Sequence, residues 1–173
     1  MAVSYRSNNL AGAVGGLFGG QLAAHGRDVA FLVRPARAEA LRTEGLQLIG
    51  TAGGPQDEVR TVPVVALTVD DLPAAEPFDV VLLAVKAYGL DGAIADIAPA
   101  MDRGAAVLPV LNGMRHLDVL AGRFGAERLI GDFAFVSSYL DGQGRINTGP
   151  VPAALTYGGL DGSVPQRKRR FPW

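Results

Sequence analysis

Cysteine is absent from the 173 residues of the chain. Its absence excludes disulfides, thiol nucleophiles and cysteine-ligated metal sites, and it fits a reducing compartment. Histidine is almost as scarce, because the chain has only His25 and His116. A histidine-rich metal site is therefore not expected, and we predict no metal cofactor.

Long apolar runs and a large net charge are also missing. No stretch approaches the ~20 apolar residues of a membrane helix, and the N-terminal segment MAVSYRSNN has no apolar core of a signal peptide. With 16 basic and 17 acidic residues, the net charge is −1, which gives no general attraction to nucleic acid or anionic membrane. We expect a soluble, cytoplasmic protein that binds neither. The basic cluster at 167–170 is expected to be part of a disordered tail rather than a nucleic-acid site.

Apolar residues make up 49% of the chain, enough for a core, and their pattern alternates between strands and helices. Antiparallel strands are expected at 129–138, 145–147 and 154–157, with a hairpin turn at 141–144. Earlier strands are expected at 28–33, 46–49, 62–67, 78–85 and 105–110, and helices at 11–26, 35–44, 91–101 and 114–124. This order predicts an α/β fold, a Rossmann-like doubly wound parallel sheet with a few antiparallel strands at its C-terminal end. Its ligand crevice lies at the carboxyl ends of the strands.

A glycine cluster provides the strongest local signal. A dinucleotide-binding turn has the pattern G-x-G-x-x-G, and Gly12 and Gly15 take its second and third places. Leu10 stands in the first place, and residues 1–10 look irregular where a buried strand is expected. Taken alone, the cluster fits equally well a glycine-rich helix with one smooth side, which lies very close to a sheet.

Three polar residues follow three successive predicted strands. Arg34 ends the strand at 28–33, where an arginine favours a 2′-phosphate and hence NADP over NAD, and Arg37 is placed to assist. Lys86 follows the strand at 78–85 and is suited to a phosphate or a substrate carboxylate. Asn112 follows the strand at 105–110, and its amide both donates and accepts hydrogen bonds. Each alone is as consistent with a surface residue, but together they favour one crevice.

Several segments, taken in order, resemble the ketopantoate reductase family. They are GAVGGLFGGQLAAHGRDV (12–29) followed by Arg34, FDVVLLAVKAY (78–88), LPVLNG (108–113) and GQGRINTG (142–149). The resemblance runs over 11–162, which we take as the NADP-binding domain, between the irregular segment 1–10 and the tail 163–173. It implies an oxidoreductase that uses NADPH to reduce 2-dehydropantoate to pantoate, a step in pantothenate biosynthesis.

The resemblance also implies site residues. Asn112 would contact both cofactor and substrate, Lys86 would lie near the cofactor, Arg34 would hold the 2′-phosphate, and Ser137 would face the nicotinamide. The pyrophosphate turn would be formed by Leu10, Ala11, Gly12, Ala13, Val14 and Gly15. The family's proton-donor lysine belongs to a helical C-terminal domain that has no counterpart here, so Asn112 and Lys86 are the nearest catalytic candidates.

The departures at both ends lead to alternatives. We expect a truncated enzyme whose first and last residues come from shifted reading frames. The alternatives are a non-catalytic NADP(H)-binding module and a decayed fragment, with self-association through an exposed inter-domain face. A lactate-dehydrogenase-like enzyme would need an acidic residue in place of Arg34 and a suitably placed histidine.

Overall fold

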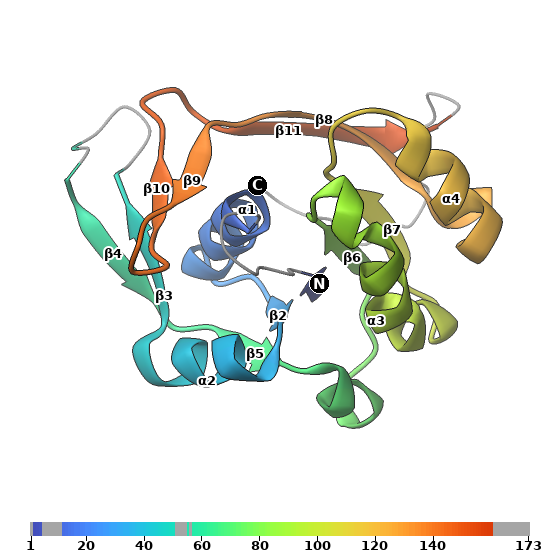
Figure 1. Cartoon of the computed structure of the whole chain (residues 1–173), viewed down its shortest axis with the longest axis horizontal. Coiled ribbons are helices and arrows are strands. Elements are labelled where there is room, and N and C mark those ends of the chain that lie inside the picture. Colours follow the sequence, from blue (N-terminus) through green and yellow to red (C-terminus); the bar gives the residue numbers. More distant parts are fainter. Residues whose placement is uncertain (1, 5–11, 51–54, 56, 161–173) are drawn as a thin grey trace.

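The structure of the chain is a computed structural model, and it describes residues 2–4, 12–50, 55 and 57–160 (Figure 1). Leu10, Ala11 and the predicted tail 163–173 lie outside these residues. Among the residues described, no helix has the length and apolar character needed to cross a membrane.

A five-stranded parallel sheet forms the centre of the fold, in the order β5-β2-β1-β6-β7. Its strands are β1 (Ala2–Ser4), β2 (Ala30–Leu32), β5 (Val65–Leu67), β6 (Val80–Leu83) and β7 (Ala106–Pro109). Counted along the chain, this order is third, second, first, fourth and fifth, which is the doubly wound arrangement that the sequence predicts. The order reverses between β1 and β6, so ligands are expected to bind beside the carboxyl end of β1.

The first strand corrects the expectation of an irregular segment for residues 2–4, while residues 1 and 5–10 lie outside the described part of the chain. Ala2–Ser4 pairs in parallel with Ala30–Leu32 on one side and with Val81–Leu83 on the other. Without this strand, β2 and β6 would each leave a row of backbone groups unpaired. Three residues are too few to produce a recognisable apolar run, and this is why the sequence pattern does not reveal the strand.

In the described part of the chain, four α-helices accompany the strands, and they match the expected helices closely. They are α1 (Ala13–Ala24), α2 (Pro35–Glu44), α3 (Leu90–Asp102) and α4 (Arg115–Phe124). Three short 3₁₀ helices also form, η1 (Val69–Ala74), η2 (Ala87–Gly89) and η3 (Ala126–Arg128). Pro35 opens α2 and Gly45 closes it with a φ of 73°, as expected from proline's fixed φ and glycine's access to positive φ.

A second sheet covers α1 and has the order β4-β3-β10-β9. Its strands are β3 (Leu46–Ile49), β4 (Val59–Val62), β9 (Ser138–Leu140) and β10 (Ile146–Thr148). In Figure 1, α1 lies between this sheet and the parallel sheet. A Cβ atom on Gly20 would come within 2.6 Å of Leu46 Cδ2, so this glycine allows the close helix–sheet approach that was expected.

The last strands form an antiparallel ribbon of β8 (Ile130–Phe135) and β11 (Ala154–Gly159), which crosses the top of Figure 1. A single bridge, Val107 to Leu129, starts β8 parallel to β7. The predicted single strand at 129–138 is wrong, because the chain leaves one sheet after Phe135 and joins another at Ser138. The predicted turn at 141–144 does connect two antiparallel strands, β9 and β10.

The core has two parts, one on each face of the parallel sheet. Phe31, Leu82 and Leu108 belong to the part shared with α1 and α2. Their neighbours Leu32, Leu83 and Val107 belong to the part shared with α3. Alternate residues therefore face opposite layers, as expected for strands that are covered on both faces.

Candidate functional site

The start of α1 lies where the order of the parallel sheet reverses. Gly12 is the residue before the helix, and no side-chain hydrogen bond caps this end. Gly12, Ala13 and Gly15 are buried, and none of them carries a side chain larger than a methyl group. The first N–H groups of a helix have no acceptor within it, which makes this end a binding place for an anion such as a phosphate. Gly12, Ala13, Val14 and Gly15 lie at the start of α1, while Leu10 and Ala11 lie outside the described residues.

A cavity of about 180 Å³ opens beside the carboxyl ends of β2 and β5. Ligand pockets commonly measure about 300–1,000 Å³, so this one is suited to one end of an extended ligand. Its lining comes from the end of β2, the start of η1 and α3, namely Leu32, Val33, Arg34, Pro35, Thr68, Val69, Asp70 and Asp96. Of these residues, only Arg34 was predicted from the sequence to be a site residue.

The two arginines of this region have different positions. Arg34 is exposed, immediately precedes α2 and lines the cavity. Arg37 is half-buried and donates a hydrogen bond from Nη2 to the carbonyl oxygen of Gly144 at 3.1 Å. A phosphate-binding role for Arg34 therefore stays a prediction, whereas Arg37 contacts the hairpin between β9 and β10.

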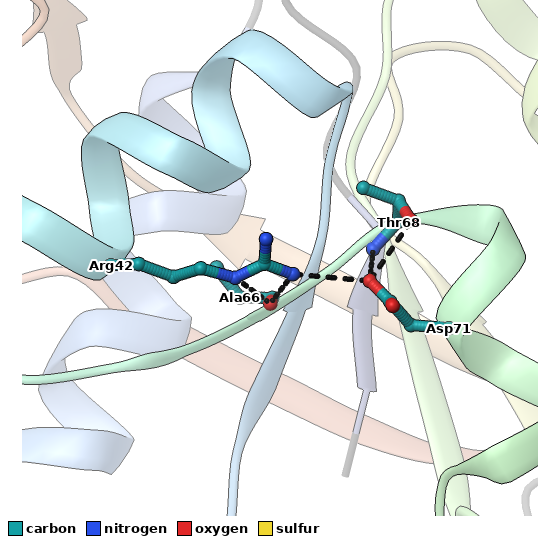
Figure 2. Close-up of polar contacts among 4 residues, drawn as sticks. All are labelled: Arg42, Ala66, Thr68 and Asp71. Carbon is teal, nitrogen blue, oxygen red and sulfur yellow. Dashed lines mark hydrogen bonds and ion pairs between the residues drawn. The ribbon is translucent and has the colours of Figure 1, made fainter.

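Figure 2 shows a polar cluster beside the cavity, formed by Arg42, Ala66, Thr68 and Asp71. Asp71 Oδ2 accepts hydrogen bonds from the backbone N–H of Thr68 at 2.7 Å and from its hydroxyl at 2.9 Å. These bonds from Thr68, followed by the charge of Arg42, lower the pKa of Asp71. The spacing of Thr68 and Asp71 is that of a capping box, a signal that was available in the sequence and was missed.

The other predicted site residues also lie at carboxyl ends of strands. Lys86 is exposed and comes directly before η2, just beyond β6, and Asn112 is exposed in the turn beyond β7. Ser137 follows β8, which starts parallel to β7. Parallel strands have their carboxyl ends at one edge of the sheet, so the topology brings Lys86 and Asn112 to the same edge as Arg34, whereas Ser137 follows a strand of a separate two-stranded sheet.

Ser137 is held by a close backbone contact. Its carbonyl oxygen accepts a hydrogen bond from the N–H of Gly149 at 2.8 Å. A Cβ atom on Gly149 would lie 2.8 Å from Ser137 Oγ, which is too short for any real contact. A side chain at position 149 would therefore displace Ser137.

The Asp132 carboxyl and the His116 imidazole have altered pKa values. Asp132 lies on β8 opposite Tyr157 of β11, and burial raises its pKa to about 6. His116 is buried in α4, and burial lowers its pKa. His25 ends α1, at the opposite end from Gly12. The arrangement gives neither histidine the carboxylate-supported position of a lactate-dehydrogenase-like site.

Known proteins are similar to the chain in both sequence and fold. "Uncharacterized oxidoreductase YkpB" of Bacillus subtilis is 35% identical over 161 residues, covering 92% of this chain and 50% of that protein. A "2-dehydropantoate 2-reductase" of Pyrococcus abyssi is 30% identical, covering 93% of this chain and 48% of that protein. The chain thus spans about half the length of these curated relatives.

Among solved structures, D-mandelate dehydrogenase in a ternary structure with NADH and anilino(oxo)acetate superposes with a TM-score of 0.75. The superposition covers 92% of this chain and 49% of the dehydrogenase chain at 20% identity, which shows a common fold. Residues 11–162 match the family model described as "Ketopantoate reductase PanE/ApbA". This match extends over most of the chain, with the glycine turn, Arg34, Lys86, Asn112 and Ser137 all inside it or at its edge, and the chain therefore belongs to the ketopantoate reductase family of oxidoreductases.

Proposed function

We propose that the chain is the NADP(H)-binding half of an enzyme that reduces 2-dehydropantoate to pantoate with NADPH, in pantothenate biosynthesis. One observation carries the proposal. The glycine-rich start of α1 has no side-chain cap and follows β1 along the chain, and the Arg34 cavity lies beside the ends of β2 and β5 in the same doubly wound sheet. This combination suits an extended ligand with a phosphate-rich middle and a ring at one end.

The pyrophosphate of the cofactor is assigned to the turn formed by residues 10–15. Gly12 and Gly15 have no side chain to keep a phosphate away from the backbone, and no side-chain hydrogen bond caps the start of α1, so its first N–H groups suit an anion. Leu10 and Ala11 complete this turn in the family resemblance. D-mandelate dehydrogenase has the same fold and was solved with NADH, which supports a nicotinamide dinucleotide as the ligand.

The adenosine end is assigned to the cavity beside Arg34. A guanidinium at the end of the second parallel strand is the feature that accommodates a 2′-phosphate. The same cavity is lined by the carboxylates of Asp70 and Asp96, which repel a phosphate. The preference for NADP over NAD therefore depends on Arg34 and not on the overall charge of the cavity.

The nicotinamide end and the substrate are assigned to the other strand ends, near Lys86, Asn112 and Ser137. The bound dinucleotide supplies the hydride. The Asn112 amide is suited to donate to a substrate oxygen while accepting from a ribose hydroxyl. Lys86 offers an exposed cation for the carboxylate of a 2-oxo acid, and the reductase name of the Pyrococcus abyssi relative supports that substrate class.

The developing alkoxide needs a general acid. We propose that the full-length enzyme supplies it as a lysine of the helical domain that the family resemblance implies, since the curated relatives are about twice as long as the chain. We further propose a cytoplasmic location and no nucleic-acid or membrane partner. The chain alone then binds NADPH but reduces little 2-oxo acid.

An exposed apolar face supports self-association of the isolated chain. Phe133 and Phe135 are alternate residues of β8, with 70% and 56% of their surfaces exposed. Contiguous apolar surface of this kind is typical of interfaces between domains or chains. Sedimentation of the wild type and of the Phe133→Ser/Phe135→Ser variant tests this: a shift to smaller species in the variant supports it, and identical monomers contradict it.

Two assays on the full chain test the proposed function. Calorimetric titration with NADPH measures binding, and loss of absorbance at 340 nm measures NADPH oxidation in the presence of 2-dehydropantoate. Binding with little or no oxidation supports the cofactor-binding half, and binding with turnover supports a self-sufficient reductase. Failure to bind NADPH contradicts the proposal and favours a decayed fragment.

A further inference from the structure

The polar cluster of Figure 2 joins three elements that are separate in the sequence. Arg42, in α2, donates from Nε and Nη2 to the carbonyl oxygen of Ala66 in β5, at 3.1 and 2.9 Å. The same Nη2 donates to Asp71 Oδ2 in η1 at 3.1 Å. One guanidinium therefore fixes the edge strand and the following 3₁₀ helix relative to α2.

The carbonyl of Ala66 lies on the free edge of the sheet. β5 is an outermost strand and pairs only with β2 in the parallel sheet. On the paired side, the backbone N–H of Val33 donates to the carbonyl oxygen of Leu67 at 2.9 Å. On the other side, Arg42 donates to the Ala66 carbonyl oxygen the hydrogen bonds that a neighbouring strand would otherwise donate. The end of β5 is thus held from both sides just before it enters the cavity wall.

The cavity wall begins where β5 ends. Residues 68, 69 and 70 all line the cavity, and Asp71 is the next residue. Asp71 Oδ2 accepts both hydrogen bonds from Thr68 as well as the one from Arg42. The three lining residues are therefore enclosed in a capping box whose carboxylate is tied to a neighbouring helix, while neither Arg42 nor Asp71 lines the cavity itself.

We propose that Arg42 and Asp71 are positioning residues that hold residues 68–70 in the shape that accepts the adenosine end of a nicotinamide dinucleotide. The inference rests on the proposed function, because it assumes that the cavity binds that end of the cofactor. A wall that is free to move must be ordered when the ligand binds, and that cost weakens binding. The two side chains act through the wall and make no contact with the ligand.

The exposure of the pair separates this role from a general contribution to folding. The Arg42 and Asp71 side chains are 45% and 42% exposed, and exposed ion pairs contribute little to the stability of a whole domain. Removing the pair is therefore expected to change ligand affinity more than thermal unfolding. Asp141 provides a matched control, because its carboxylate, like that of Asp71, accepts two local hydrogen bonds and one arginine bond, in a hairpin turn that does not line the cavity.

The experiment compares the wild-type chain with Asp71→Ala, Arg42→Lys and the control Asp141→Ala. Lysine keeps the charge of Arg42 but lacks the planar fork that reaches Ala66 and Asp71 together. Calorimetric titrations use NADPH and adenosine 2′,5′-bisphosphate, a probe with only the adenosine end. We expect both Kd values to rise by the same factor, about tenfold or about 1.4 kcal/mol, in Asp71→Ala and Arg42→Lys, and to stay unchanged in Asp141→Ala.

The outcomes separate this inference from the proposed function. A wild-type chain that binds neither probe contradicts the proposed function and this inference with it. A wild-type chain that binds both probes, with unchanged Kd values in Asp71→Ala and Arg42→Lys, overturns the positioning role alone. A fall in melting temperature without a common rise of both Kd values assigns the cluster a purely structural role and also overturns it.

Discussion

Arg37 in α2 and Gly144 in the β9–β10 turn are 107 residues apart in sequence, yet the Nη2 of the arginine donates to the glycine carbonyl oxygen at 3.1 Å. This bond ties the helix after the second parallel strand to the sheet that covers α1. Arg34, three residues earlier, lines the cavity instead. The two arginines are three residues apart in the sequence but have different surroundings, and the first prediction depends on this difference.

Arg34→Gln is predicted to reduce the preference for NADPH. The substitution removes the guanidinium assigned to the 2′-phosphate, so we expect the Kd for NADPH to rise by about tenfold, or about 1.4 kcal/mol, while the Kd for NADH stays constant. Titration of both cofactors into the wild type and the variant measures the ratio. Arg37→Gln is the matched control, with a lower melting temperature and an unchanged ratio. If Arg37→Gln alone changed the ratio, the assignment of the two arginines would be reversed.

Gly45→Ala is predicted to destabilise the fold. Gly45 has φ 73° and ψ −179°, a region that is essentially confined to glycine and costs other residues about 1–3 kcal/mol. A Cβ atom there would also lie 3.0 Å from the backbone oxygen of Val62. We expect a loss of about 2–3 kcal/mol in the free energy of unfolding, measured by urea denaturation.

The control for Gly45 is Gly26→Ala. Gly26 has a similar φ of 71°, but a Cβ atom there would meet nothing within 4 Å. Its substitution is expected to cost only the backbone strain, about 1–2 kcal/mol. Equal losses in the two variants would mean that the contact with Val62 is relieved by a shift of the chain.

Asp132→Asn is predicted to stabilise the fold at pH 7.5. Burial raises the pKa of Asp132 from 3.8 to about 6, so the protonated form is favoured in the folded state. Its contribution is complete below pH 3.8 and is lost as the pH rises through about 6. Because this carboxyl is half-exposed, we expect a discounted gain of about 1 kcal/mol, or about 2–4 °C in melting temperature.

The pH dependence provides the check on Asp132. The gain of Asp132→Asn should shrink from pH 7.5 to pH 4, as the wild-type carboxyl becomes protonated. Asp71→Asn should show the opposite sign, because the pKa of Asp71 is lowered in the folded state and its contribution is present above pH 3.8. A pH-independent effect at Asp132 would show that its burial is not the cause.

Much of this fold was predictable from periodicity and glycine placement. All four α-helices were located, because apolar stripes such as Ala93, Ile94 and Ile97 recur at helical spacing and Gly45 ends its helix. β1 was missed because three residues carry no period, and its pairing comes from two distant strands. The break between β8 and β9 was missed because these two strands follow each other closely in the sequence and form one run there, although they belong to different sheets.

The candidate site was less predictable. Arg34, Lys86 and Asn112 were predicted as site residues because each follows a strong strand pattern, and parallel topology places such ends at one edge of the sheet. The cavity wall at residues 68–70 follows a short edge strand, and Asp96 reaches the cavity from α3. The Arg42 contacts connect three elements, and no local pattern reports such a long-range arrangement.

Calorimetric titration of the full chain with NADPH and with NADH tests the central claim most directly. The account predicts one binding site per chain and a lower Kd for NADPH than for NADH, because Arg34 lines the cavity that we propose receives the 2′-phosphate. No binding of either cofactor, or tighter binding of NADH, would contradict it.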